Sequence, residues 1–434
     1  MTSKLMLTEH FDDVLRDIVE NHFFFRHSST LSLEYLLNRL SHADTLNFTE
    51  SFYAMAHIVA SVNEAVNRLL FRREQKILEE FVALFIYRFH DQLSKRPIST
   101  EEIAGFAGAL LLLDTIPLKY TRKLLNMGGT GGDKGLTHNG ENYTLNFNPS
   151  TCTMIAIAAS GVPIHKHHSV AYTSKIGGVE AFSALGVPRA QNDPSIVLRA
   201  LNRFHLAATD FLVYHMSPRI MRQLRQQNTE LFSFMHIVGP LASPAYLSDT
   251  VHFLGLSHEY ALQTVADALS ILSEHNIIKN PRGVLFRGLD DNGDAAFDEI
   301  SPFSTELLLF NEGASKRVLL RTAEIIGQPI IPNSTDFLNL FTCRKDKSLA
   351  KQFNNNYRII NDPTFASPAK NIVILSAALA KQVYRHNYDP ETFNERDFVN
   401  RLKREYISTD QAFRAGEVAR YWSDYLQLYA GLAI

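Results

Sequence analysis

The sequence predicts an α/β protein: a small N-terminal helical domain, then a larger domain with a mainly parallel central sheet flanked by helices. Apolar residues recur every three or four positions before residue 120, as in amphipathic helices. Glycines cluster just after Asn126, and strand-like and helix-like segments alternate from there on. We therefore expect a mainly helical domain over residues 1–120 and an α/β domain over residues 121–434.

The helical prediction depends on spacing and on capping residues. Leu31–Leu40, Glu50–Phe71 and Glu74–Phe89 each place apolar residues at helical intervals. A further helix is expected to begin after Ser99, because a Ser or Thr cap followed by early acids suits a helix N-terminus. No strand pattern separates these segments, so helices in series are predicted.

Short connections between strands and helices predict the parallel sheet. A strand, a helix and a strand joined by short loops imply a right-handed crossover. The Asn-rich and Lys-rich stretch Asp346–Pro368 is predicted to be a mobile surface loop. Strands are expected at Lys123–Met127, Val162–His165, Phe211–His215, Thr250–Leu256 and Gly283–Arg287, with a hairpin of Leu307–Phe310 and Arg317–Arg321, and helices from Ser150 to Ser160 and at Gly177–Leu185, Glu259–His275, Lys370–His386, Asn394–Tyr406 and Thr409–Tyr429.

Composition narrows the class of protein. The 43 Lys and Arg residues against 45 Asp and Glu leave a net charge of −2, without the basic surplus of a duplex-DNA binder. The only cysteines, Cys152 and Cys343, form no CxxC pair and are expected to be buried apolar side chains in a reducing compartment. No segment reaches the roughly 20 apolar residues of a membrane span. A cytoplasmic protein without a membrane partner is predicted.

The glycine-rich segment Gly129–Asp133 predicts an anion site. Glycines let backbone N–H groups turn toward an anion without a Cβ in the way. Ser150-Thr151 follow at a predicted helix N-terminus, which is a second natural seat for a phosphate. A glycine cluster alone is more often a turn, but the helix start behind it favours the anion site.

Charged residues near two strand ends extend this prediction. Lys166 is expected in the loop after a strand, facing a ligand crevice, where an ammonium can neutralise phosphate. Asp298-Glu299 follow another strand, and adjacent carboxylates can hold hydrated Mg²⁺ that bridges phosphates. A solvated lysine and solvated loop acids are the alternatives. His165, His167 and His168 are expected to be buried and hydrogen-bonded rather than to ligate a metal.

Taken in order, five sequence blocks resemble the anthranilate phosphoribosyltransferase family, which also includes the pyrimidine-nucleoside phosphorylases. The resemblance covers roughly Ser99 to His386. Any one block is weak, whereas five in the right order are difficult to obtain by chance. The blocks are Gly129–Asp133 (GTGGD), Asn148–Thr151 (N-x-S-T), Lys166-His167 with Ser174-Lys175, Val238–Pro244 (LGPLxNP) and Asp298–Ser301 (DE-x-S).

The resemblance implies a Mg²⁺-dependent transfer of phosphoribose from phosphoribosyl pyrophosphate to anthranilate or a related aromatic or amine acceptor, within tryptophan biosynthesis. It implies a homodimer formed through the helical domain, which also lines the active-site cleft. It implies a metal site of Ser150, Asp298 and Glu299 and no covalent nucleophile. Contacts to phosphoribosyl pyrophosphate are implied for Gly129, Thr130, Gly131, Gly132, Asp133, Asn148, Ser150, Thr151, Lys166 and Ser174.

The acceptor end departs from the family. The family's Gly-Asn-Arg after Lys-His becomes His168-Ser169-Val170, so an amide shortens to a hydroxyl and a charge is lost. The family's acceptor-binding Arg falls by spacing on Gln226, with Arg225 beside it. His167, Ser169 and Arg225 are the predicted acceptor contacts. The loss of a buried polar partner costs about 1–3 kcal/mol, enough to change acceptor preference.

Two other functions remain open from the sequence. A nucleoside-phosphorylase-like enzyme would run the glycosidic chemistry with phosphate, and the paired acids Asp298-Glu299 speak for pyrophosphate instead. A catalytically silent relative would bind nucleic acid or a protein partner on the same scaffold. The altered segment after Lys166 motivates that alternative, whereas the near-neutral net charge makes nucleic acid the less favoured partner.

Overall fold

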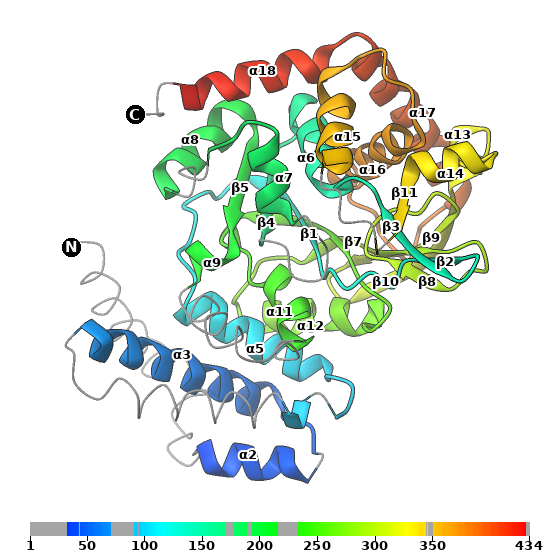
Figure 1. Cartoon of the computed structure of the whole chain (residues 1–434). Helices are drawn as coiled ribbons and strands as arrows, with labels where there is room; N and C mark the ends of the chain where they lie inside the picture. Colours follow the sequence, from blue (N-terminus) through cyan, green and yellow to red (C-terminus); the bar gives the residue numbers. More distant parts are fainter. Residues whose placement is uncertain are drawn as a thin grey trace. The chain divides into compact units, whose positions relative to one another are not determined.

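The computed structural model describes residues 33–42, 44–70, 91–93, 95–169, 177–188, 193–215, 233–343, 345 and 350–430. They fall into two compact units (Figure 1). Within the described residues, no helix is long and apolar enough to cross a membrane. The first unit covers Met1–Pro117, Phe211–Tyr246 and Asp267–Ile278, and the second covers Leu118–Asp210, Leu247–Ala266 and Lys279–Ile434.

The first unit is helical, and its two best-packed helices touch through a glycine. A Cβ added at Gly105 of α5 would lie 2.5 Å from the Cβ of Ser51 in α3. Ser99 caps α5 in a reciprocal capping box with Glu102, as the sequence predicts. The predicted helix Glu74–Phe89 lies outside the described residues. The helices are α2 (Leu33–Ser41), α3 (Phe48–Leu70), α5 (Thr100–Leu113), α9 (Phe211–Tyr214), α11 (Ser233–Leu241) and the end of α12 (Leu262–Glu274).

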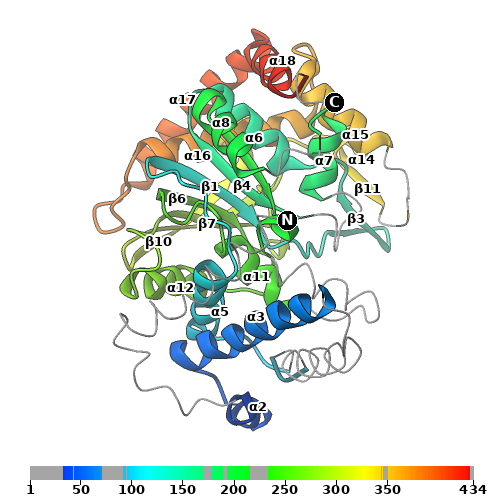
Figure 2. The ribbon, with the colours of Figure 1, turned by 90° about the vertical axis from the view of Figure 1, so that its left-hand side faces the viewer.

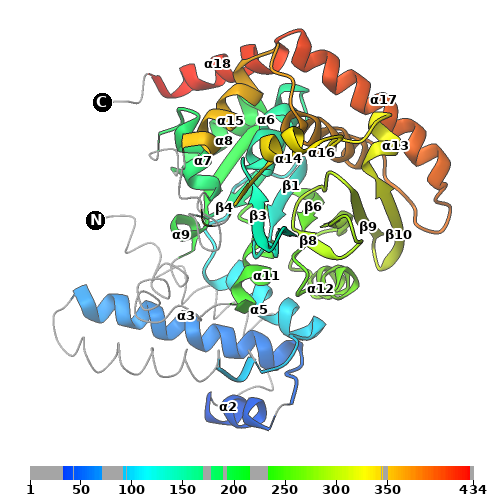
Figure 3. The same ribbon diagram turned by 45° about the vertical axis from the view of Figure 1, so that its right-hand side comes forward.

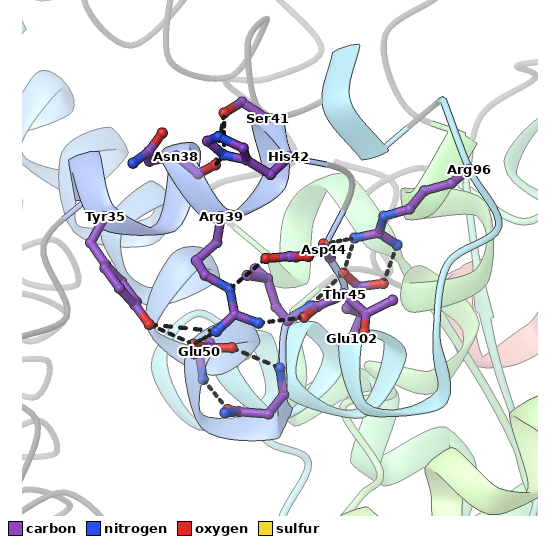
Figure 4. A network of polar contacts seen from close by, with 12 residues as sticks. Tyr35, Asn38, Arg39, Ser41, His42, Asp44, Thr45, Glu50, Arg96 and Glu102 are labelled. Carbon is purple, nitrogen blue, oxygen red and sulfur yellow. Dashed lines mark hydrogen bonds and ion pairs between the residues drawn. The ribbon is translucent and has the colours of Figure 1, made fainter.

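Ion pairs join the ends of helices in this unit (Figure 4). Arg96 donates two hydrogen bonds to the fully buried Glu102, and one of them, from Nη1 to Oε2, measures 2.8 Å. Glu102 also accepts the backbone N–H groups of Leu46 and Ser99, at 3.0 and 2.9 Å. Arg39 of α2 binds Glu50 of α3 at 2.9 Å. These pairs fix the connection between α2, α3 and α5.

The second unit is built on a mixed sheet with a parallel centre, which confirms the predicted fold class. β1 pairs in parallel with β4 and β6, β4 with β5, and β6 with β7. The order of the sheet is β10-β9-β7-β6-β1-β4-β5, with β8 beside β7 and antiparallel β9 and β10 at one edge. The strands are β1 (Lys123–Gly129), β4 (Ile164–His168), β5 (Leu206–Asp210), β6 (Asp249–Gly255), β7 (Arg282–Leu289), β8 (Ala295–Phe297), β9 (Ser304–Asn311) and β10 (Ala314–Arg321).

Helices cover one face of this sheet, where α6, α8 and α16 to α18 lie together (Figure 2). α16 is buried along most of its length and packs against α6 and α17. The hydrophobic core of the unit lies between these helices and the sheet. The helices are α6 (Pro149–Ala159), α7 (Gly178–Ala184), α8 (Pro194–Phe204), α13 (Thr322–Ile326), α14 (Ser334–Leu340), α15 (Ala350–Asn361), α16 (Pro368–Arg385), α17 (Glu395–Arg414) and α18 (Glu417–Ala430).

The segment after the glycine cluster forms a small second sheet (Figure 3). β2 (Leu136–His138) and β3 (Glu141–Leu145) make a hairpin, and β11 (Phe341–Cys343) pairs with β3. The backbone N–H of Gly135 donates to the carbonyl of Ala296, which ties the hairpin to β8. The long segment beyond Asp133 is therefore ordered structure next to the glycine loop.

Three element predictions are wrong. Phe211–His215 is helix α9 rather than a strand, because a short buried apolar run has no periodicity that separates the two. Most of the predicted loop Asp346–Pro368 is helix α15, whose Asn356 side chain is fully buried. α17 continues past the predicted break at Thr409, since the Thr409 hydroxyl donates to the carbonyl of Glu405 in the preceding turn.

Candidate functional site

The glycine loop lies at the carboxyl end of β1, near the middle of the sheet. The loop is anchored through Thr130, whose N–H donates to the carbonyl of Gly255 and whose hydroxyl accepts the N–H of Ser257. A Cβ at Gly129 would lie 2.6 Å from Oδ2 of Asp298, so a side chain there would displace the Asp298 carboxylate. Gly131 has a φ of 65°, in the left-handed region that favours glycine. The turn thus brings backbone N–H groups next to an acidic segment.

Three carboxylates gather around this loop. Asp298 Oδ2 accepts the N–H of Gly131 at 2.6 Å, and the N–H of Asp298 donates to Asp133 Oδ1, also at 2.6 Å. Burial raises the pKa of Glu299 to about 8, and the charge of Asp298 adds to the shift. Burial and then Asp298 likewise hold the pKa of Asp133 well above its ordinary value. The cluster therefore holds more negative charge than its protein neighbours neutralise.

The N-terminus of α6 faces the same carboxylates. Asn148 caps the helix, because its Oδ1 accepts the N–H of Thr151 at 2.9 Å, and Pro149 occupies the first turn. The hydroxyl and the backbone N–H of Ser150 lower the pKa of Glu299 and so partly oppose the effect of burial. A helix start with its positive dipole end therefore lies beside Glu299.

Lys166 brings a positive charge to this cluster, although its predicted place is wrong. It lies inside β4, which extends three residues beyond the predicted strand end, and its side chain is buried rather than in a loop. Burial lowers the pKa of Lys166, and the carboxylates of Glu299 and Asp298 oppose that shift. The one ammonium group thus interacts with two of the three carboxylates.

The residues of the cluster fit a magnesium ion, which the family resemblance implies. Among the described residues, no group of three or more His, Cys, Asp or Glu side chains is arranged to hold a metal. Mg²⁺ in phosphate sites usually binds one or two carboxylates together with water and substrate phosphates. The raised pKa values of Asp133 and Glu299 show the uncompensated acidity that such a cation would neutralise. Asp298 and Glu299 therefore form a suitable but incomplete ligand set.

The three histidines of β4 are buried as predicted, and His165 and His167 are hydrogen-bonded, whereas Nδ1 of His168 has no hydrogen-bond partner among the described residues. His165 and His167 both contact the hydroxyl of Thr209 on β5, at 2.8 and 2.7 Å. His168 points to the other face of the strand and packs edge-on against Phe182 of α7. A Cβ at Gly178 would lie 2.7 Å from the Cβ of His168, so the large side chain at 168 needs the glycine at 178.

The structure brings most of the predicted phosphoribosyl residues together, whereas one of them and one predicted acceptor residue lie outside what it describes. The glycine loop, the α6 start, Lys166 and Asp298-Glu299 are joined by the contacts given above. His167 lies one residue from Lys166 but on the opposite strand face, and Ser169 follows the strand end. Ser174 and Arg225 lie outside the described residues.

Sequence reasoning missed two residues that hold the site in place. Asn356 Oδ1 accepts the backbone N–H of Asn148 at 2.9 Å, which fixes the residue before α6. Ser257 binds Thr130 of the glycine loop. Ser257 directly follows the predicted strand Thr250–Leu256, so its position could have indicated a role at the strand end. Asn356 lies in a polar tract that resembles a surface loop.

Comparison with known proteins agrees with these features. Residues 121–284 match the model of the glycosyl transferase family, a/b domain. An anthranilate phosphoribosyltransferase of Lactiplantibacillus plantarum is 30% identical over 226 residues, which cover 52% of this chain and 59% of that protein. One of Thermomicrobium roseum is 27% identical over 64% of this chain and 72% of that protein. The sequence match to the first of these relatives thus spans about three fifths of its length.

Solved structures share the fold over nearly the whole chain. The anthranilate phosphoribosyltransferase of Thermus thermophilus superposes with a TM-score of 0.65 at 20% identity, over 91% of this chain and 99% of that one. The Saccharomyces cerevisiae enzyme, solved in complex with PRPP and Mg, gives a TM-score of 0.68 at 16% identity, over 93% and 99%. Residues 121–284 of the chain thus match the glycosyl transferase family, a/b domain, and the chain has the fold of the anthranilate phosphoribosyltransferases.

Proposed function

We propose that the protein is a Mg²⁺-dependent phosphoribosyltransferase that moves phosphoribose from phosphoribosyl pyrophosphate to anthranilate or a related aromatic or amine acceptor, releasing pyrophosphate. One observation carries the proposal: the glycine loop, the α6 start, Lys166 and the acidic pair Asp298-Glu299 meet at one place. Solved in complex with PRPP and Mg, the Saccharomyces cerevisiae relative supports the same ligands here.

The residues of the cluster have separate tasks in this proposal. Mg²⁺ held by Asp298, Glu299 and Ser150 would neutralise the negative charge of the phosphates. The glycine loop would bind phosphate oxygens through groups such as the Gly131 N–H once it is released from Asp298, and the start of α6 adds the positive end of its dipole. The Lys166 ammonium stabilises the charge that develops on the leaving pyrophosphate. No covalent intermediate is needed, since stabilisation of the leaving group is sufficient.

The acceptor is the less defined partner. The segment after Lys166 reads His167-His168-Ser169-Val170, with neither the amide nor the Arg of the family motif. His167, Ser169 and Arg225 remain the proposed acceptor contacts, with Ser174 among the phosphoribosyl contacts. A homodimer in the cytoplasm remains part of the proposal. The acidic pair favours a pyrophosphate substrate over the phosphate of a nucleoside phosphorylase, because two phosphates and a shared cation need two carboxylates.

Calorimetric titration of phosphoribosyl pyrophosphate, with and without Mg²⁺, tests the proposal. We expect Mg²⁺-dependent binding that the Asp298→Ala/Glu299→Ala variant loses. Asp291→Ala/Asp294→Ala is the matched control, because it removes two exposed acids from the neighbouring loop and should bind like the wild type. Absence of binding by the wild-type protein would overturn the transferase proposal and favour the silent relative.

A further inference from the structure

Helix α15 places two asparagines against the short stretch of chain that leads into α6. Asn356 Oδ1 accepts the backbone N–H of Asn148 at 2.9 Å, across 208 positions of the sequence. Asn355 Nδ2 donates to Asn146 Oδ1 at 2.9 Å and to the carbonyl of Asn146 at 3.4 Å. Two neighbouring residues of α15 therefore hold both ends of the stretch 146–148.

Backbone groups determine the orientation of each of these amides. The N–H of Asn148 can only donate, so the Asn356 amide must present its oxygen to it. Asn146 Nδ2 donates to the carbonyl of Asn339 at 2.7 Å, so its Oδ1 is left to accept from Asn355. Asn146 and Asn356 are 0% exposed, hence bulk water does not compete for these bonds. The stretch is thus held in one defined position.

The same stretch sets the start of α6 at the candidate phosphoribosyl site. Asn148 Oδ1 accepts the N–H of Thr151 at 2.9 Å and the hydroxyl of Ser150 at 3.3 Å. Ser150 in turn lowers the pKa of Glu299, one of the carboxylates of the site. Asn356 therefore binds the backbone of the residue whose side chain orients Ser150 and Thr151, and a movement of that residue would be passed to both.

We propose that Asn356, with Asn355 in support, is a positioning residue that holds the start of α6 where the phosphates of phosphoribosyl pyrophosphate bind. The inference rests on the proposed transferase function and adds α15 to the elements that form its substrate site. Groups that contact a substrate must be held to within about 0.5 Å, and the residues behind them supply that precision. Asn355 has the smaller part, because two backbone carbonyls, at positions 339 and 340, also hold Asn146.

Hydrogen exchange of the full chain, measured by mass spectrometry without ligand, tests whether Asn356 holds this stretch. Asn356→Leu keeps the approximate size of the side chain and removes the acceptor. Exchange in the peptide that covers residues 146–151 should then quicken about tenfold, while exchange in β1 and β6 stays unchanged.

Two further variants separate the lost bond from a general effect of substitution in α15. Asn356→Asp keeps an oxygen that faces the Asn148 N–H. It loses no bond, because Nδ2 of Asn356 has no hydrogen-bond partner among the described residues, so it should retain the wild-type protection. Asn361→Leu is the matched control, since the Asn361 amide donates to the carbonyl of Tyr357 within the same helix, and it should exchange like the wild type over residues 146–151.

Calorimetric titration of phosphoribosyl pyrophosphate in the presence of Mg²⁺ adds the functional measurement. Asn356→Leu should raise the Kd about tenfold, the scale of one lost hydrogen bond, and Asn355→Leu should raise it by less. The KM for anthranilate, used as the probe acceptor, should stay unchanged, because the stretch 146–148 is proposed to serve the phosphate end of the site.

Three results would overturn the inference: unchanged exchange over residues 146–151 in Asn356→Leu, exchange that quickens throughout the α/β unit, or an unchanged Kd. If Asn356→Leu did not fold, Asn355→Leu would make the same two measurements at a partly buried position. If the wild type failed to bind phosphoribosyl pyrophosphate, the proposed function would fall, while the exchange result would still decide whether α15 fixes the start of α6.

Discussion

Two buried polar clusters in this molecule are built on opposite principles. In the helical unit, two buried carboxylates each have a guanidinium partner: Glu102 binds Arg96 and Glu50 binds Arg39. In the α/β unit, three carboxylates lie together, and the ammonium of Lys166 interacts with only two of them, Asp298 and Glu299. Paired charges of the first kind hold helices together, whereas an excess of like charge costs stability and is retained where a ligand neutralises it. Charge compensation thus distinguishes the scaffold from the candidate site.

Removal of a cation from the polar cluster of the helical unit should have the largest effect on the free energy of unfolding. In Arg96→Leu, Glu102 stays fully buried with its charge uncompensated, and only the backbone N–H groups of Leu46 and Ser99 remain. Breaking a buried pair in this way costs about 3–5 kcal/mol of unfolding free energy. Urea denaturation followed by circular dichroism measures the loss. Arg96→Leu/Glu102→Leu should recover part of it, and a single variant as stable as the wild type would contradict the structural role.

Removal of a charge from the acidic cluster should raise the stability of the protein, whereas Arg96→Leu should lower it. The pKa of Glu299 is raised to about 8 in the folded chain, so the folded state holds its proton more tightly than the unfolded chain. Stability from this group is therefore fully present below about pH 4.5 and is lost as the pH rises toward 8. Glu299→Gln should flatten this part of the stability profile in Mg²⁺-free buffer.

Melting temperatures between pH 5 and 8 would measure the difference between the two proteins. Asp291→Ala, which removes an exposed acid, is the control and should retain the wild-type slope. Glu299→Gln should also weaken Mg²⁺-dependent binding of phosphoribosyl pyrophosphate, so a gain in stability and a loss of binding appear in one variant. A wild-type profile without any loss of stability toward pH 8 would contradict the excess of negative charge.

The sequence predicts the features that depend on neighbouring residues and misses those that depend on residues far apart in the chain. The α/β class, the sheet strands and the five motif blocks follow from apolar spacing and local glycine or capping patterns, which are properties of neighbouring residues. The ion pair of Arg39 with Glu50 and the contact of Asn356 with Asn148 join residues whose pairing no local pattern shows. The sequence predicts Lys166 in a loop after a strand, whereas it lies buried in β4, where the distant carboxylates of Glu299 and Asp298 favour its charged form.

Loss of the partly exposed arginine of the helical unit should have the smallest effect on the free energy of unfolding. Arg39 has a side chain 35% exposed, and Glu50 keeps hydrogen bonds from Tyr35 and from the N–H of Asn47 when the arginine is lost. Partly exposed pairs contribute at most about 1 kcal/mol, so Arg39→Leu should cost far less than Arg96→Leu in the same urea titration. Arg39→Lys, which keeps the charge, should lie between Arg39→Leu and the wild type. Equal losses for the two leucine variants would show that burial does not set the strength of these pairs, and would remove the basis for separating scaffold charges from site charges.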